Sequence, residues 1–285
     1  MRFGDGASDC RTSQEIERTA LRQLLALFRT TRPLSSLVAG TLSASVVIAA
    51  QGRLSSVSVA AGLTMTTLTM FGFVVNDVVD FDKDARAGVR RPIATGELSR
   101  SRGVLFAVAL LFAVYLAAPV VGTGGKVLAV TSLALVAYSP LAKRFPLCKG
   151  AYVAVLCCAP LWYGTVTGGV QRTWLPYATL ACFVLGREAL MDSDELVGDR
   201  RAGLNTIASI LGCRRTWRIG TIVMVLSAVL LVGIERGSIG RIAALAMLLS
   251  LTLVFLWPGL SDGRRIQLSR FPMLIGAVAI AVGVK

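Results

Sequence analysis

The sequence contains no histidine and few acidic residues, and both shortages narrow the range of possible functions. Of its 285 residues, 16 are aspartate or glutamate, whereas 30 are lysine or arginine. The absence of histidine excludes Ser-His and Cys-His catalysis and most catalytic zinc sites. The six cysteines form no C-x-x-C pair, so we expect free thiols that pack as small hydrophobic side chains.

The sequence also has little charge for its length and is rich in apolar residues. Charged residues make up 16% of the chain, against about 25% in soluble domains, and hydrophobic residues make up 54%. Several apolar segments approach the roughly 17–25 residues that cross a bilayer as a helix. We therefore expect an all-α, polytopic membrane protein with about nine transmembrane helices, at 33–50, 57–77, 102–121, 124–139, 150–168, 174–191, 218–234, 240–257 and 269–284.

The first 32 residues are expected to form a separate cytoplasmic segment ahead of the membrane domain, 33–285. Within this segment, residues 14–31 alternate apolar residues with arginines. That pattern predicts an amphipathic helix lying on the membrane surface, in contact with membrane lipids.

The distribution of lysine and arginine predicts the orientation of the chain in the membrane. If the N-terminus is cytoplasmic, 24 lysines and arginines lie on the cytoplasmic side and 6 on the other side. The positive-inside rule is satisfied only in this orientation. The net charge of +14 is then explained by cytoplasmic loops facing anionic lipid or substrate, and nucleic acid is not expected as a partner.

Nine of the sixteen acidic residues lie in two short windows that are four spans apart, both on the predicted cytoplasmic face. In each window three carboxylates have the spacing 0, +3 and +7, which on a continuous helix places them on one face. Such clustering is costly unless a cation compensates the negative charge. The two groups are Asp77, Asp80 and Asp84, and Asp192, Glu195 and Asp199.

Oxygen ligands without histidine or cysteine favour Mg²⁺, which binds one or two carboxylates together with substrate phosphates. The four-span offset between the clusters suggests an internal duplication that places them opposite each other across a central cavity. The simpler alternative is that the carboxylates are solvated charges at helix ends. Two clusters with the same spacing, each beside a basic loop, favour the metal site.

A phosphate-bearing substrate would need cations in addition to the metal, and the same face supplies them. Arginine binds phosphate oxygens in a bidentate manner, and lysine acts as a point charge. Any one of these residues could instead only reflect the positive-inside rule. The candidates are Arg32, Arg91, Lys143, Arg144 and Arg187.

These segments, taken in order, resemble the UbiA superfamily of intramembrane prenyltransferases. Residues 76–84 (NDVVDFDKD) match the first aspartate-rich motif of that family, NDxxDxxxD, and residues 91–96 resemble the RPxxxG segment that follows it. Tyr138 with Lys143 and Arg144 resembles the Tyr-x(4)-Lys-Arg region, and residues 187–206 resemble the second acidic motif. Glu195 departs from the pattern, because the family has aspartate there.

The resemblance implies a helical bundle around a central cavity that is capped by the two cytoplasmic acidic loops. It implies two Mg²⁺ ions that bridge the carboxylates and the diphosphate of an isoprenoid substrate, with Asn76 helping to hold metal or diphosphate. The expected reaction ionises the allylic C–O bond, with water excluded, and transfers the prenyl group to an acceptor. Aromatic faces could stabilise the carbocation, although ordinary packing is the simpler role for each of the candidates Phe71, Phe73, Tyr138, Trp162 and Tyr163.

The identity of the acceptor stays open on these grounds. We narrowly prefer an aromatic acceptor, because aromatic prenylation is the commoner activity of the family. The alternatives are prenyl transfer to a glycerol-phosphate lipid, a UbiA-type terpene cyclase, and a cation or phosphate transporter. The transporter is the weakest alternative, because coupling acids in transporters usually lie near the bilayer midplane rather than at its edge.

Overall fold

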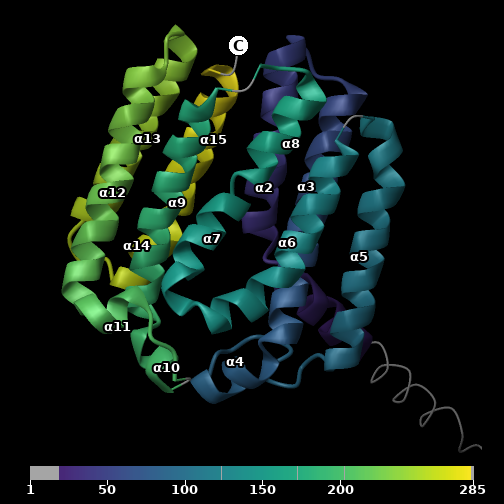
Figure 1. Ribbon diagram of the computed structural model, residues 1–285, viewed down its shortest axis with the longest axis vertical. Helices are drawn as coiled ribbons and strands as arrows, with labels where there is room; N and C mark the ends of the chain where they lie inside the picture. Colours follow the sequence, from purple (N-terminus) through teal and green to yellow (C-terminus); the bar gives the residue numbers. More distant parts are fainter. Residues whose placement is uncertain (1–18, 123, 172, 202, 284–285) are drawn as a thin grey trace, which may run out of the picture.

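A computed structural model describes residues 19–122, 124–171, 173–201 and 203–283, and every regular element in these ranges is a helix (Figure 1). The first is a helix at residues 19–30. The half of the chain that carries the first acidic cluster continues with α2 (Pro33–Gln51), α3 (Ser56–Val79), α4 (Phe81–Ala87), α5 (Arg100–Val121), α6 (Gly125–Arg144), α7 (Lys149–Leu156) and α8 (Ala159–Gly168). A short 3₁₀ turn at Pro146–Cys148 joins α6 to α7. The second half contains α9 (Trp174–Asp194), α10 (Leu196–Arg201), α11 (Ile207–Leu211), α12 (Cys213–Ile234), α13 (Ser238–Leu256), α14 (Asp262–Leu268) and α15 (Arg270–Gly283).

The prediction of about nine spans is close to what the structure contains. Within the described ranges, eight helical segments are long and apolar enough to cross a membrane. The helix α9 occupies the remaining predicted range, 174–191, with 21 residues that include charges at its end. The chain is therefore an integral, multi-pass membrane protein.

The fifth span is not one continuous helix, because α7 ends at Leu156 and α8 begins at Ala159. Pro160 lies in the first turn of α8, where its missing N–H costs nothing. In a continuous helix its ring would clash with the carbonyl of residue 156, four positions earlier. The break at Cys157 and Cys158 follows from this proline.

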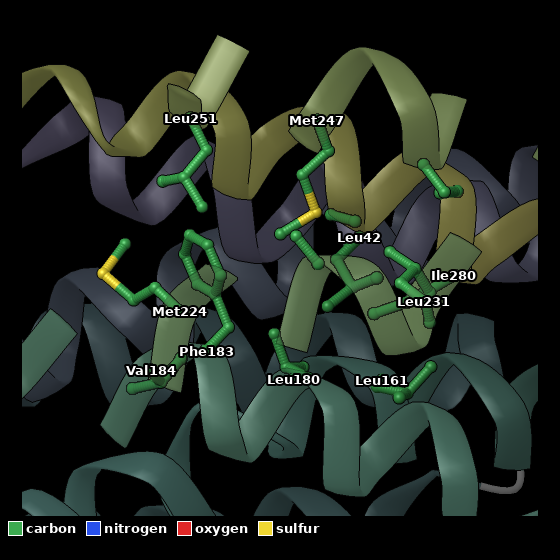
Figure 2. Packing of buried hydrophobic residues seen from close by; sticks show 14 of the residues in the cluster. Leu42, Leu161, Leu180, Phe183, Val184, Met224, Leu231, Met247, Leu251 and Ile280 are labelled. Atoms are coloured by element: carbon green, nitrogen blue, oxygen red, sulfur yellow. The ribbon is translucent and has the colours of Figure 1, made fainter. Parts of the chain in front are cut away.

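The interior contains two clusters of buried apolar side chains, one in each half of the molecule. The first joins α2, α3, α5, α6 and α8 around residues such as Met65 and Leu68. The second joins α9, α12, α13 and α15, and Figure 2 shows Phe183, Leu231 and Met247 among its side chains. Helix α2 contributes to both clusters and packs against α15, so it connects the two halves.

Some helices approach so closely that only glycine fits between them. A Cβ atom added to Gly186 of α9 would lie 2.6 Å from the carbonyl oxygen of Gly220 in α12, and the reverse substitution gives the same distance. Small residues at helix interfaces allow this close packing in membranes, where no hydrophobic force drives helices together. Two interhelical hydrogen bonds add to it: Ser227 Oγ donates to Thr179 O over 2.7 Å, and Ser43 Oγ donates to Pro160 O over 2.7 Å.

Candidate active site

The first acidic motif lies where α3 ends, and it does not form a single helix as the spacing predicted. Asp80, with φ −89° and ψ 8°, separates α3 from α4, so Asp77 belongs to one helix and Asp84 to the next. The two carboxylates nevertheless come together on one guanidinium. Arg91 Nη1 lies 3.3 Å from Asp77 Oδ1 and 2.6 Å from Asp84 Oδ2.

The second acidic motif has the same arrangement. Helix α9 ends at Asp194, Glu195 adopts φ −83° and ψ −2°, and α10 follows. Asp192 therefore lies on the long helix and Asp199 on the short one, and both are buried. The prediction of one continuous carboxylate face is wrong for this motif as well. In both motifs the chain turns at the middle acidic residue.

The two short helices also end alike. Gly88 after α4 and Gly203 after α10 both adopt left-handed backbone, with φ of 70° and 72°. In each case the following residue donates its N–H to the carbonyl oxygen of the motif's last aspartate, from Val89 to Asp84 and from Leu204 to Asp199, both over 2.9 Å. Left-handed glycine ends of this kind satisfy helix carbonyls that lack partners. The match supports the internal duplication suggested by the spacing.

Each carboxylate of the first motif is paired with a cation. Arg32 Nη2 lies 2.9 Å from Asp77 Oδ1, and Lys143 Nζ lies 3.0 Å from Asp80 Oδ1 while also donating to Val79 O. Burial alone would lower the pKa of Arg91, but Asp77 and Asp84 outweigh it and raise that pKa. Burial raises the pKa of Asp84 even though Arg91 opposes the shift.

The carboxylates of the second motif face lysines. Lys149 Nζ lies 2.9 Å from Asp192 Oδ1 and 3.5 Å from Glu195 Oε2. Lys83 Nζ approaches Asp199 Oδ1 to 3.7 Å, whereas Asp199 Oδ2 is buried and has no hydrogen-bond partner in the described part of the chain. Burial raises the pKa of Asp199, and Lys149 and Lys83 oppose this.

The two motifs meet at one end of the bundle, where α4 and α10 lie side by side (Figure 1). Lys83 of α4 and Asp199 of α10 link them. One pocket between them is lined by Asp80 and Asp199 together with three lysines and the aromatic ring of Tyr138. Its full lining is Asp80, Lys83, Tyr138, Ser139, Ala142, Lys143, Pro146, Lys149, Asp199, Leu204 and Thr206.

The donor set fits a hard cation such as Mg²⁺, because it consists of carboxylate oxygens and one amide oxygen. Among the described residues, no three carboxylates or thiols converge on one point, since lysines and arginines lie between them. A buried carboxylate oxygen without a partner, such as Asp199 Oδ2, is the kind of atom that a cation would satisfy.

Most of the remaining predicted substrate residues lie at the same end. Ser139 Oγ donates to Asn76 Oδ1 over 2.8 Å, and Tyr138 lines the pocket with its ring tilted against Tyr152. Arg187 is largely buried beside Glu188, 3.8 Å away. Arg144 differs from these, because its exposed guanidinium lies over the Phe145 ring, and the structure does not bring it to the pocket.

The aromatic candidates are more scattered than predicted. Phe73 lies under Arg32, whose guanidinium carbon is 4.6 Å from the ring centroid. Phe71 and Trp162 pack in or against the first core cluster. The ring of Tyr163 contacts Gly124, at the start of α6, so it lies toward the end of the bundle away from the acidic motifs. For Tyr163 the structure therefore supports ordinary packing, the simpler of the two roles considered for it.

Three cations at this end escaped the sequence analysis as site residues: Lys83, Lys149 and Arg270. Lys83 lies inside the first acidic motif, which was a sufficient signal. Lys149 and Arg270 had been counted only as positive charges of cytoplasmic loops. Lys149 immediately precedes the predicted span 150–168 and Arg270 is the second residue of the span 269–284, so the positive-inside rule already accounted for both charges.

Comparison with known proteins identifies the family. The model of the UbiA prenyltransferase family matches residues 37–282, which is most of the chain. The chain belongs to the UbiA prenyltransferase family. It is 33% identical over 189 residues to a digeranylgeranylglyceryl phosphate synthase of Natronomonas pharaonis, an alignment that covers 65% of this chain and 68% of the relative. It is 26% identical over 235 residues to a digeranylgeranylglyceryl phosphate synthase of Methanothrix thermoacetophila, covering 80% and 88%.

Solved UbiA structures share this fold. The apo structure of a UbiA homologue from Aeropyrum pernix superposes with a TM-score of 0.71 at 18% identity, covering 86% of this chain and 96% of that one. A UbiA homologue from Archaeoglobus fulgidus bound to DMAPP and Mg²⁺ gives a TM-score of 0.63 at 17% identity, covering 90% and 99%. The predicted UbiA resemblance and the helical membrane fold are thus confirmed.

Proposed function

We propose that this UbiA family member transfers a prenyl group from an isoprenoid diphosphate to a glycerol-phosphate lipid in a Mg²⁺-dependent reaction. The observation that carries the proposal is the pocket that both acidic motifs share. Asp80 and Asp199 line it from opposite halves of the chain, and Lys83, Lys143 and Lys149 surround it. A pocket with both carboxylates and several lysines suits a metal-bound diphosphate better than it suits a metal ion alone or a diphosphate alone.

The metal would be held by Asp77, Asp80 and Asp84 with Asn76 on one side, and by Asp192, Glu195 and Asp199 on the other. When bound, Mg²⁺ supplies positive charge that stabilises the diphosphate as a leaving group. Lys83, Lys143 and Lys149 would bind diphosphate oxygens from the pocket walls, and Arg91 would hold Asp77 and Asp84 in place. Arg144 is no longer proposed, because its exposed guanidinium lies over the Phe145 ring and does not line the pocket.

The surrounding bundle would exclude water from the reacting allylic carbon. The interior beneath the acidic motifs is built from apolar clusters in both halves of the molecule. Water in such a site would convert the allylic cation to an alcohol, so its exclusion is part of the chemistry. The outer faces of α5 and α13 are apolar as well, with Leu105, Phe112, Leu249 and Leu253 exposed, as expected for contact with lipid.

The names of the relatives favour a glycerol-phosphate lipid as acceptor over the aromatic ring that the sequence analysis narrowly preferred. That preference came from the frequency of aromatic prenylation in the family and not from a residue. The relatives described above, by contrast, are named as synthases of a prenylated glyceryl phosphate. They match this chain in sequence as well as in family.

We propose that the acidic motifs face the cytoplasm, because most lysines and arginines lie on that side. The helix at 19–30 lies before α2 and exposes Leu21, Leu24, Leu25 and Phe28, which form one apolar stripe. Such a stripe fits an interfacial helix resting on lipid. Residues 14–18 of the predicted amphipathic helix lie outside the described ranges.

The test uses purified protein with radiolabelled geranyl, farnesyl and geranylgeranyl diphosphates, with Mg²⁺ or EDTA. Acceptors are a prenylated glycerol phosphate and a panel of phenols. Mg²⁺-dependent product with the glycerol phosphate supports the proposal. Product with phenols only would restore the aromatic acceptor, and hydrocarbon without acceptor would indicate a cyclase. If no diphosphate is consumed under any condition, the reaction is wrong and transport must be tested in vesicles.

A further inference from the structure

A second group of cations lies at the same end of the bundle but does not line the pocket. Arg32 at the start of α2, Arg187 of α9 and Arg270 at the start of α15 come from three different helices. Helix α15 packs against both α2 and α9, and α2 and α15 begin at the end of the bundle where α9 ends (Figure 1). The three guanidinium groups therefore share one region at the inner side of the site.

Arg187, and the Phe73 ring on which the Arg32 guanidinium lies, are about one helical turn farther from the end of the bundle than the carboxylates of their own helices. Arg187 precedes Asp192 by five residues, and the Phe73 ring beneath Arg32 precedes Asp77 by four. At 1.5 Å per residue, these separations correspond to roughly 6–8 Å along the helices. Arg187 is thus placed between its acidic motif and the apolar interior, and Arg32 lies between Asp77 and the Phe73 ring.

Two of the three arginines lack the partners that buried guanidinium groups normally have. Arg270 has no hydrogen bond and no acidic side chain within 4.0 Å among the residues that the structure describes, and its Nε is buried. Within the described ranges, Arg187 Nε is also buried without a partner, and its Nη1 contacts only Met191 Sδ and, at 3.8 Å, Glu188. A buried, unpaired charge is costly, so such groups usually meet an anion in the working protein.

We propose that Arg187 and Arg270, with Arg32 beside them, bind the phosphate monoester of the lipid acceptor. This inference rests on the proposed function and adds the site of the acceptor to it. A phosphate monoester carries up to two negative charges and three oxygens, which match the forked donors of two guanidinium groups. A phenol without an acidic substituent offers no such anion, so the site selects phosphorylated lipids over plain phenols.

The prenyl diphosphate is the other possible source of phosphate at these arginines, and its position separates the two cases. The lysines that would bind the diphosphate line the outer pocket together with Asp80 and Asp199, whereas neither Arg187 nor Arg270 contributes to that lining. With diphosphate in the outer pocket, the inner arginines remain for the acceptor. Its phosphate would then hold the glycerol hydroxyl close to the allylic carbon.

The decisive variant is Arg270→Met in the full-length chain, with Arg270→Lys to keep the charge and exposed Arg264→Met as a matched control. Binding of a prenylated glycerol phosphate is measured without turnover, by the shift that it causes in thermal unfolding in detergent. The same ether lipid with a free hydroxyl is the comparison ligand. KM values for acceptor and for prenyl diphosphate are then measured separately.

In Arg270→Met, the Kd and KM of the phosphorylated lipid should rise about tenfold to hundredfold, the range of a lost charge-assisted hydrogen bond. The KM of the diphosphate and the Kd of the hydroxyl lipid should change less than about twofold, and Arg270→Lys should lie between. Equal effects on both phosphorylated substrates, or none on either, would overturn the inference. Binding of lipid phosphate that depends on Arg270, in a protein that consumes no diphosphate, would instead refute the proposed reaction and leave this site standing.

Discussion

Replacing Lys149 by methionine should make the second acidic motif bind Mg²⁺ more tightly. The Lys149 ammonium lies 2.9 Å from Asp192 and 3.5 Å from Glu195, and its side chain is only 13% exposed. Any metal ion that binds Asp192 must first displace this internal cation. Methionine has a similar length and flexibility without the charge, so the competition disappears.

The contacts of Lys149 set the size of the expected effect. A hydrogen bond to a charged group contributes about 1.5–3 kcal/mol. Removing one such competitor should tighten the Kd for Mg²⁺ by about tenfold to hundredfold. We discount the contact to Glu195, whose side chain is 42% exposed and therefore partly screened by solvent.

The assay is direct titration of Mg²⁺, or of Mn²⁺ followed by electron paramagnetic resonance, in detergent and without substrate. Lys149→Arg keeps the charge and should bind Mg²⁺ like the wild type. Lys126 is an exposed lysine at the end of α6 that is remote from the pocket, so Lys126→Met should have no effect on Mg²⁺ binding. The metal-free Lys149→Met protein should also melt at a lower temperature than the wild type, because Asp192 loses its partner, and added Mg²⁺ should recover the difference. Unchanged or weaker Mg²⁺ binding by Lys149→Met would refute the competition.

Three further predictions test other parts of the molecule. Asp80→Asn and Asp199→Asn should each lower kcat by about a thousandfold or more without unfolding the protein, whereas exposed Asp82→Asn should be close to wild type in a prenyl-transfer assay. Gly186→Ala should lower the free energy of unfolding by about 1–3 kcal/mol, because its Cβ would lie 2.6 Å from the Gly220 carbonyl oxygen. Unfolding of the purified protein in detergent measures this change. Gly233→Ala is the control, because the space around Gly233 is open. Burial raises the pKa of Glu235, whose side chain packs against Gly240 and Gly283. A carboxylate whose pKa is higher in the folded state destabilises the folded protein increasingly as the pH rises above the pKa of the unfolded state. Glu235→Gln should therefore raise the melting temperature at pH 8. Near pH 4 the variant and the wild type should melt at similar temperatures.

The spans and the two acidic motifs were predictable because their signals are local. A run of apolar residues of bilayer length needs no tertiary context, and the spacing of Asp77, Asp80 and Asp84 is visible in any reading of the chain. The helix break at Asp80 was not predictable from that spacing. The number of residues between the aspartates is the same whether the helix continues through Asp80 or a changed ψ at that residue ends it. The break at Cys157, by contrast, could have been predicted from Pro160.

The partners of the carboxylates could not be predicted, because they depend on contacts between distant segments. Arg32 meets Asp77 across 45 positions, and Lys149 meets Asp192 across 43. In a membrane protein the positive-inside rule already explains a cytoplasmic lysine or arginine, so a functional cation does not stand out. Arg144 was chosen from its motif, yet it does not line the pocket. Arg270 was passed over, although its Nε is buried without a partner in the described part of the chain.

The pairing of charges in the first motif suggests how metal and substrate enter together. Asp77, Asp80 and Asp84 are neutralised by Arg32, Arg91 and Lys143, so a metal ion alone would meet carboxylates that already have partners. A diphosphate alone would meet cations that are occupied in the same way. When both arrive, the carboxylates can turn to the metal and the lysines to the phosphate oxygens, so that neither set of charges is left unpaired. A site built on such an exchange favours the metal–diphosphate complex over either component, because separate binding would leave buried charge uncompensated.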